Sequence, residues 1–216
     1  MYHYGLGRLC SRLRMFRSGS RFLKAFNEIG INITMEQARR PMGMAKIDHI
    51  RELFKMDGVG EEFEKLYHRP WNEQDVIDMN AKFEEYLFAS LANYTDPIPG
   101  VIETLNELRK QGIKIGSTTG YTQAMMDVVL PNAARKGYTT DKCVTPNGLP
   151  AGRPLPYMIT KHDRSCHPST DCVLKYGDTI ADIKEGINAK VWTVGVILGS
   201  NELGLTQEEV RTNVLP

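Results

Sequence analysis

The sequence lacks paired cysteines, a large net charge and long apolar runs, and each absence argues against a class of protein. Its 216 residues include only four cysteines, none of them in a CxxC pair, and a formal net charge of +1. Scattered cysteines without such spacing are typical of a reduced intracellular protein. A net charge so close to zero gives no bulk field that would attract nucleic acid or a membrane surface. No apolar run approaches the roughly 20 residues that a membrane-spanning helix needs. We therefore expect a cytoplasmic globular protein with no nucleic-acid and no membrane partner.

Acidic residues are absent from the start of the chain, where Glu28 is the first and Asp48 is the first aspartate. Residues 1–21 are instead rich in arginine and serine. An acid-poor segment of this composition can be an organelle transit peptide, although we favour a disordered basic tail or the misread start of a gene. We interpret residues 1–21 as an atypical basic N-terminal segment.

Residues 22–94 have helical periodicity and no strand signal. Thr34-Met35-Glu36-Gln37 is a capping box that opens a short helix, and residues 72–94 form a long amphipathic pattern. This part of the chain predicts a small all-helical domain. The stretch Asp96-Pro97-Ile98-Pro99-Gly100 then marks a domain boundary, because proline and glycine interrupt both helices and strands.

Beyond the boundary, short apolar runs alternate with helical segments. We expect helices between the strands and a last helix opening at a capping box, Thr206 to Glu209. Strands that alternate with helices predict a parallel, right-handedly wound sheet. The sequence therefore predicts an α/β fold with a Rossmann-like core over residues 95–216. The expected strands lie at 113–116, 142–144, 172–176 and 191–196.

Two carboxylates follow the expected strand 172–176, in the stretch from Tyr176 to Asp182. Ligands of parallel sheets bind at the carboxyl ends of the strands, and a pair of aspartates there suits Mg²⁺, which prefers oxygen ligands. Asp178 and Asp182 are thus candidate metal ligands. The alternative is an ordinary loop in which Asp178 caps the next helix.

Hydroxyl groups follow another expected strand, in the stretch Gly116-Ser117-Thr118-Thr119-Gly120-Tyr121. Hydroxyls and backbone N–H groups that lead into a helix N-terminus predict an anion site, although a helix cap followed by a glycine turn has the same pattern. Arg153 precedes a further expected helix and can bind a phosphate bidentately, although alone it would be a solvated loop arginine. Together with the two aspartates, these loops predict a phosphoryl-binding pocket.

The order of these motifs resembles the haloacid dehalogenase superfamily, whose later motifs are a Ser/Thr, a Lys/Arg and a pair of acids. The resemblance implies a Rossmannoid sheet with an inserted helical cap domain, which residues 22–94 would form. The stretch from Arg39 to His49, Arg-Arg-Pro-Met-Gly-Met-Ala-Lys-Ile-Asp-His, is similar to the cap signature of the phosphonoacetaldehyde hydrolase (phosphonatase) family. The similarity covers about residues 22–210. It implies hydrolysis of the C–P bond of a small organophosphonate, phosphonoacetaldehyde, to acetaldehyde and phosphate with Mg²⁺.

The resemblance also implies a role for each matching residue. Lys46 would form a Schiff base with the substrate aldehyde, Thr119 would bind phosphoryl oxygens, and Arg153 would neutralise charge in the transition state. Asp178 would hold Mg²⁺ with Asp182 in support. The remaining substrate-binding candidates are Met42, Gly43, His49, Thr118, Gly120 and Tyr121.

Simpler alternatives apply to several of these residues. Lys46 could be a surface lysine, His49 a solvated helix histidine, and Met42 and Tyr121 ordinary core residues. A homodimer formed through the cap is a further expectation.

The chain departs from the family pattern at its first motif. An apolar strand ending in a nucleophilic aspartate should precede the cap, and spacing from Lys46 puts that aspartate near Gly5. We therefore expect the core to lack its central first strand and to stop short at its C-terminus. A truncated or misread gene is the simplest explanation, followed by an inactive relative and then by an enzyme with a relocated nucleophile.

Three functions stay open from the sequence. The first is a phosphonoacetaldehyde hydrolase-like chain, inactive or nearly so without its aspartate. The second is a general phosphatase of the same superfamily. The third is a pseudoenzyme or fragment that binds an anion or a partner without turnover.

Overall fold

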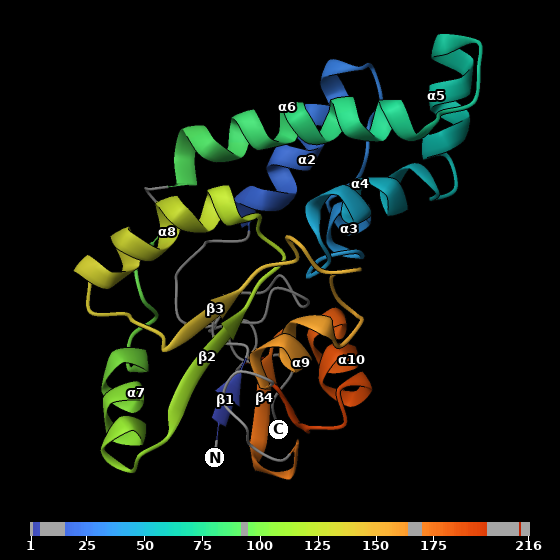
Figure 1. The fold of residues 1–216 in the computed structure, drawn as a ribbon. Helices are drawn as coiled ribbons and strands as arrows, with labels where there is room; N and C mark the ends of the chain where they lie inside the picture. The colour runs from blue at the N-terminus through green and yellow to red at the C-terminus, as the bar shows by residue number, and fades with distance from the viewer. Residues whose placement is uncertain (1, 5–15, 92–94, 164–169, 198–211, 213–216) are drawn as a thin grey trace.

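The computed structural model describes residues 2–4, 16–91, 95–163, 170–197 and 212. A layer of helices lies over one end of a parallel β-sheet, and further helices flank the sheet (Figure 1). This arrangement confirms the expected α/β fold with a helical cap. None of the helices in the described ranges is long and apolar enough to cross a membrane.

The cap consists of five helices that follow one another along the chain. The expected capping box at Thr34 is present, because its hydroxyl accepts from the Gln37 N–H while the Gln37 side chain accepts from the Thr34 N–H. The acidic stretch after Gly58 is also a helix. The five helices are α2 (Phe16–Glu28), α3 (Met35–Arg39), α4 (Lys46–Phe54), α5 (Val59–Tyr67) and α6 (Glu73–Leu91).

The core is a five-stranded sheet in the order β3-β2-β1-β4-β5, and every pairing is parallel. Parallel neighbours require crossover connections, which the helices supply. The strands are β1 (Tyr2–Tyr4), β2 (Lys114–Thr118), β3 (Lys142–Val144), β4 (Val173–Gly177) and β5 (Trp192–Gly195). The crossover elements are α7 (Val101–Lys110), α8 (Gln123–Arg135), α9 (Tyr157–Asp163), the 3₁₀ turn η2 (Thr170–Cys172) and α10 (Ile180–Asn188).

The expectation that the central strand is missing was wrong. β1 occupies the central place, with Tyr2 beside Lys114 of β2 and beside Val173 of β4. Parallel pairing uses backbone groups, and a strand of three residues does not need the long apolar run that a full central strand shows. The cap also begins earlier than expected, since α2 starts at Phe16 within the segment that we had set apart as 1–21. The helix expected from Thr206 lies outside the described residues.

Hydrophobic packing joins the cap to the core. The larger cluster of buried side chains contains residues of all five cap helices, and it continues into Met125, Met126 and Val129 on α8. A smaller cluster around Leu105 and Ile115 fixes α7 against β2. Because α8 contributes to the apolar core of the cap, the cap is anchored beside the loops that end β2 and β4 (Figure 1).

The packing of α6 yields a test of the cap. Leu87 is fully buried on α6, whereas Ile77 on the same helix is 45% exposed. We expect Leu87→Ala to lower the free energy of unfolding by about 2–5 kcal/mol, because it removes buried methyl groups and leaves a cavity. Ile77→Ala should lower it by less than about 1 kcal/mol. Urea unfolding followed by circular dichroism measures both, and equal losses would contradict the burial of this face of α6.

Candidate active site

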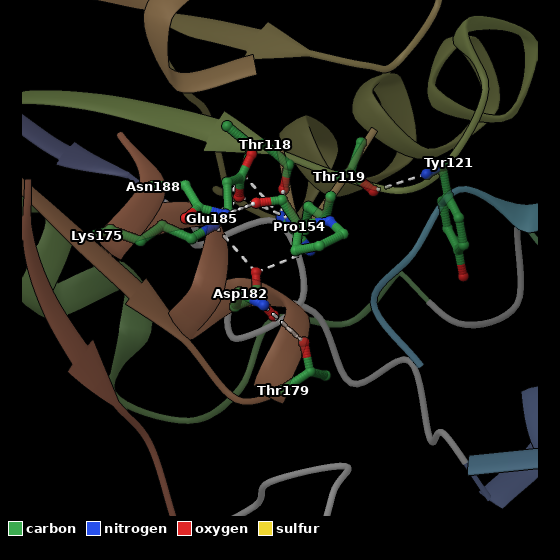
Figure 2. Close-up of polar contacts among 10 residues, drawn as sticks. Thr118, Thr119, Tyr121, Pro154, Lys175, Thr179, Asp182, Glu185 and Asn188 are labelled. Carbon is green, nitrogen blue, oxygen red and sulfur yellow. Dashed lines mark hydrogen bonds and ion pairs between the residues drawn. The ribbon is translucent and has the colours of Figure 1, made fainter. Parts of the chain in front are cut away.

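A cluster of buried charges lies where β2 and β4 end. Arg153 and Lys175 supply two cations, Asp182 and Glu185 supply two carboxylates, and each of these side chains is at most 3% exposed. Arg153 pairs with Asp182 and with Glu185, each at 2.8 Å. Lys175 pairs with the same two carboxylates, at 3.0 and 2.8 Å (Figure 2). Since every charge faces two opposite charges, the cluster can be buried without leaving an isolated ion.

The hydroxyl of Thr118 lies at the centre of this cluster. Its oxygen accepts from Arg153 Nη2 at 2.7 Å and from Lys175 Nζ at 2.9 Å, and it donates to Glu185 Oε2 at 3.2 Å. A hydroxyl has one donor and two acceptor positions, so all three are occupied. The hydroxyl of Thr118, a candidate substrate-binding residue in the sequence, thus fixes the positions of the charged side chains around it.

Asp182 is held at both of its carboxylate oxygens. Oδ1 pairs with Arg153 and Lys175, and Oδ2 accepts from the Thr179 hydroxyl at 2.6 Å. Thr179 is also the N-cap of α10, since its oxygen accepts from the Asp182 N–H at 3.2 Å. Burial alone would raise the pKa of Asp182, but the attraction of Arg153 and Lys175 and the bond from Thr179 hold that pKa well below its usual range. Asp182 is therefore a fixed carboxylate.

Asp178 is the remaining carboxylate at the end of β4, and it is 7% exposed. Its charge adds to the attraction that the two acids of the cluster exert on Arg153. Among the described residues, no group of three or more His, Cys, Asp or Glu side chains could hold a metal ion. Asp182 is already engaged at both of its oxygens, and Asp178 is the other carboxylate of the predicted pair.

The loop after β2 presents donors toward the cap. Thr119 Oγ1 accepts from the Tyr121 N–H at 3.1 Å, so the hydroxyl hydrogen of Thr119 can be donated to another group. Three N–H groups of Arg153 form hydrogen bonds, one to Glu185 and two to Thr118, and Nη1 forms an ion pair with Asp182 Oδ1. Nη1 can also donate to a further acceptor. These groups together can bind an anion.

Lys46 lies in the cap at the start of α4, and it is only 2% exposed. Its Nζ is 5.6 Å from the ring centroid of Tyr121, which belongs to the loop after β2. The lysine is therefore a buried amine close to the anion-binding loop, and the surface alternative for Lys46 does not hold. Tyr121 connects the two parts of the site, because its ring faces the lysine and its backbone is tied to Thr119.

His49 is fully buried one turn after Lys46. Its Nε2 lies 3.0 Å from the carbonyl oxygen of Ala38. A carbonyl can only accept, so Nε2 carries a proton, and the neutral ring has its lone pair at Nδ1. The ring stacks on Phe22 with centroids 4.0 Å apart. His49 is thus a fixed part of the cap interior and is not the solvated helix histidine of the simpler alternative.

Small residues allow the cap loop to approach the core closely. Gly43 has a φ of 97°, a conformation that favours glycine, and a Cβ there would collide with the hydroxyl of Thr179. A Cβ at Gly120 would likewise collide with the carbonyl oxygen of Met44. Met42, beside this loop, is 3% exposed. These contacts bring the stretch before Lys46 against the loops that end β2 and β4.

The structure brings the predicted site residues into two adjoining groups. Thr118, Thr119, Arg153, Asp178 and Asp182 gather at the end of the sheet. The second group lies at the cap and against it, and it comprises Met42, Gly43, Lys46, His49, Gly120 and Tyr121.

Sequence reasoning missed Lys175 and Glu185. A signal existed for both, because Lys175 is a charge inside a buried strand and Glu185 lies three residues after Asp182 on the same helix face.

Other nucleophiles near this site are poorly suited to attack. Burial raises the pKa of the Cys143 thiol to about 11, so that thiol is protonated at neutral pH. Asp48 pairs with Arg51 on α4. No aspartate occurs before Asp48 in the sequence, and Gly5, where the family spacing puts the nucleophile, lies outside the described residues.

Comparisons with known proteins agree on the type of fold and on the family. The family model for haloacid dehalogenase-like hydrolases matches residues 14–190. The chain is 61% identical over 196 residues to a phosphonoacetaldehyde hydrolase of Bacteroides fragilis, a match that covers 90% of this chain and 74% of the relative. A phosphonoacetaldehyde hydrolase of Parabacteroides distasonis is 60% identical over 194 residues, which cover 88% of this chain and 73% of that one.

The comparison with a solved structure agrees with these sequence matches. The crystal structure of a phosphonoacetaldehyde hydrolase-like protein from Oleispira antarctica superposes with a TM-score of 0.90 at 30% identity, covering 97% of this chain and 76% of that chain. The buried lysine of the cap, the anion-binding loop and the charge cluster thus occur on a scaffold shared with these relatives. This chain belongs to the haloacid dehalogenase-like hydrolases and, among them, to the phosphonoacetaldehyde hydrolase family.

Proposed function

We propose that the site acts on phosphonoacetaldehyde, with Lys46 forming an imine at the aldehyde and the core loops binding the phosphonate. One observation carries the proposal. The buried amine of Lys46 lies against Tyr121, whose backbone N–H is bound to Thr119 in the anion-binding loop. A substrate with an aldehyde at one end and a phosphonate at the other can therefore reach both groups at once. The names of the relatives from B. fragilis and P. distasonis support the same substrate.

Imine formation makes the carbon fragment a better leaving group. The Lys46 amine adds to the aldehyde carbon, and uptake of one proton with loss of water gives an iminium. When a nucleophile attacks phosphorus, the electron pair of the C–P bond passes toward the iminium nitrogen and forms an enamine. Without the iminium, the same electrons would remain on an unstabilised carbanion. Protonation of the enamine and hydrolysis of the imine then release acetaldehyde and regenerate the amine.

The core residues bind the phosphonate and balance its charge. Thr119 can donate its hydroxyl hydrogen to a phosphonate oxygen, and Arg153 Nη1 can donate to another. Arg153 is held rigidly by Asp182, Glu185 and Thr118, so little reorganisation is needed as charge develops. Asp178 would hold Mg²⁺, which when bound supplies positive charge beside the phosphoryl oxygens. Asp182 would support that site through Thr179 and Arg153.

The 216-residue chain should form the lysine adduct but release little phosphate. Asp182 is engaged at both oxygens and Asp48 is paired with Arg51, so neither carboxylate is available to attack phosphorus. We expect borohydride to trap phosphonoacetaldehyde on Lys46, which mass spectrometry locates, while phosphate release stays near background with and without Mg²⁺. Rapid Mg²⁺-dependent release would contradict this expectation and would point to a nucleophile elsewhere in the chain.

Replacement of the lysine separates the proposal from its alternatives. Lys46→Arg keeps the charge but removes the amine that adds to an aldehyde, so the trapped adduct at that position should disappear. The matched control is Lys55→Arg, which changes an exposed lysine at the end of the same helix, α4. This variant should leave trapping unchanged. In a general phosphatase, Lys46→Arg would instead leave hydrolysis of phosphate esters intact. In a protein that only binds anions, phosphate would bind but neither chain would give an adduct.

Removal of the Asp178 carboxylate tests the metal proposal. Asp178→Asn should weaken Mg²⁺ binding, measured by calorimetry in the presence of phosphate, by at least about tenfold, because a neutral amide is a poorer ligand for a hard cation. The control is Asp57→Asn, at an exposed position in the cap, and it should bind Mg²⁺ as the parent chain does. Equal affinity in all three chains would rule out Asp178 as a ligand.

A further inference from the structure

Lys175 is a charged residue inside the sheet. It lies in β4, beside Tyr4 of β1 and Thr193 of β5, and its side chain is fully buried. Lysine is rarely buried completely unless it is paired, and moving its charge out of water has a cost that its partners must offset. The proposed chemistry gives Lys175 no part, although this residue belongs to the charge cluster at the end of the sheet.

Lys175 shares its partners with Arg153. Lys175 Nζ lies 3.0 Å from Asp182 Oδ1 and 2.8 Å from Glu185 Oε2 (Figure 2). It also donates to the Thr118 hydroxyl oxygen at 2.9 Å. Arg153 meets the same three oxygen atoms, at 2.8, 2.8 and 2.7 Å. The two cations therefore share one set of acceptors, which they approach from β4 and from the stretch before α9.

The two cations differ in what else they can reach. Lys175 is fully buried, and its Nζ is directed at three oxygen atoms that all lie within 3.0 Å. Arg153 lies on the loop side of the cluster, where its Nη1 can donate to a further acceptor. We therefore assign the contact with the phosphonate to Arg153 alone, and any effect of Lys175 on the anion acts through the charge balance around Arg153.

The acids around Arg153 would cancel its charge if no second cation were present. Asp182 and Glu185 carry two negative charges, and Asp178 adds to their attraction on Arg153. A guanidinium among these groups would lie in a region of net negative charge, which repels a phosphonate. Lys175 places a second positive charge at the same carboxylate oxygens and so balances the two acids of the cluster. Charges interact strongly where water is excluded, so one balancing charge has a large effect.

We propose that Lys175 is a positioning residue of the phosphonate site, which takes up the negative charge of Asp182 and Glu185 so that Arg153 still attracts an anion. The inference rests on the proposed function and deepens it, because it names the group that keeps the core loops attractive to the phosphonate. The competing explanation is that Lys175 only holds β4 against α10, which carries both acids.

The first test measures the affinity of the full chain for inorganic phosphate by calorimetry, without added metal. Lys175→Met removes the charge but keeps an unbranched side chain of similar length, and it should weaken phosphate binding by at least about tenfold. The matched control is Lys184→Met, at an exposed position on α10. It changes the net charge of the chain equally and should bind phosphate as the parent chain does.

Glu185→Gln separates the balance of charge from the holding of Arg153. This change removes a negative charge beside Arg153 and nearly keeps the shape of the side chain, so phosphate should bind at least about threefold more tightly. A cluster that only held Arg153 in place would instead bind phosphate more weakly. The double variant Lys175→Met/Glu185→Gln removes one charge of each sign, and its affinity should return to within about threefold of the parent. If Lys175→Met does not fold, Glu185→Gln and the double variant decide.

The cap supplies an independent readout for every variant. Acetaldehyde trapped on Lys46 by cyanoborohydride carries no phosphonate, so trapping should be equal in all chains and shows that the cap is intact.

The outcomes separate this inference from the proposed function. Phosphate affinity that is the same in Lys175→Met as in the parent, or that falls in both Glu185→Gln and the double variant, overturns the role of Lys175. A parent chain that does not bind phosphate overturns the proposed phosphonate site and this inference together. A parent chain that binds phosphate but forms no adduct at Lys46 overturns the imine chemistry alone.

Discussion

The structure depends on the mutual compensation of four charges buried at the carboxyl end of the sheet. Arg153 and Lys175 alternate with Asp182 and Glu185, and the Thr118 hydroxyl joins three of them. Taking such groups out of water costs several kcal/mol per ion, so the arrangement persists only because each ion meets its opposites with good geometry. The loop positions around the phosphoryl pocket follow from it, since β2, β4, α10 and the stretch before α9 each contribute a member.

The cap and the core solve different chemical problems with different surroundings. At the end of the sheet, the core offers charged side chains and hydroxyls, the groups that we propose bind the phosphonate. The cap buries the amine of Lys46 among aromatic and other side chains, and we propose that this amine adds to the aldehyde. Tyr121 belongs to both halves of the site, because its backbone is part of the anion-binding loop and its ring lies near Lys46. A bifunctional substrate is matched by a site with two distinct halves.

Local patterns in the sequence predicted much of this arrangement, and long-range pairing accounts for what they missed. The capping box at Thr34 was found because it is a contact between residues three apart, and the strand 142–144 because it is a short apolar run between turns. β1 was missed because its three residues, Tyr-His-Tyr, lack the continuous apolar run that marks a buried central strand. The rings of Phe22 and Phe83 stack only in the folded chain, where residues 61 positions apart meet. The pairing of Arg153 with Glu185 likewise joins residues 32 positions apart, and no local pattern predicts that pairing.

Steric fit holds the cap against the core at two glycines. Gly43 lies against Thr179 and Gly120 against Met44 with no space for a methyl group. Salt weakens attractions between exposed charges but has little effect on steric fit. These two contacts should therefore keep the cap and the core aligned when the salt concentration changes.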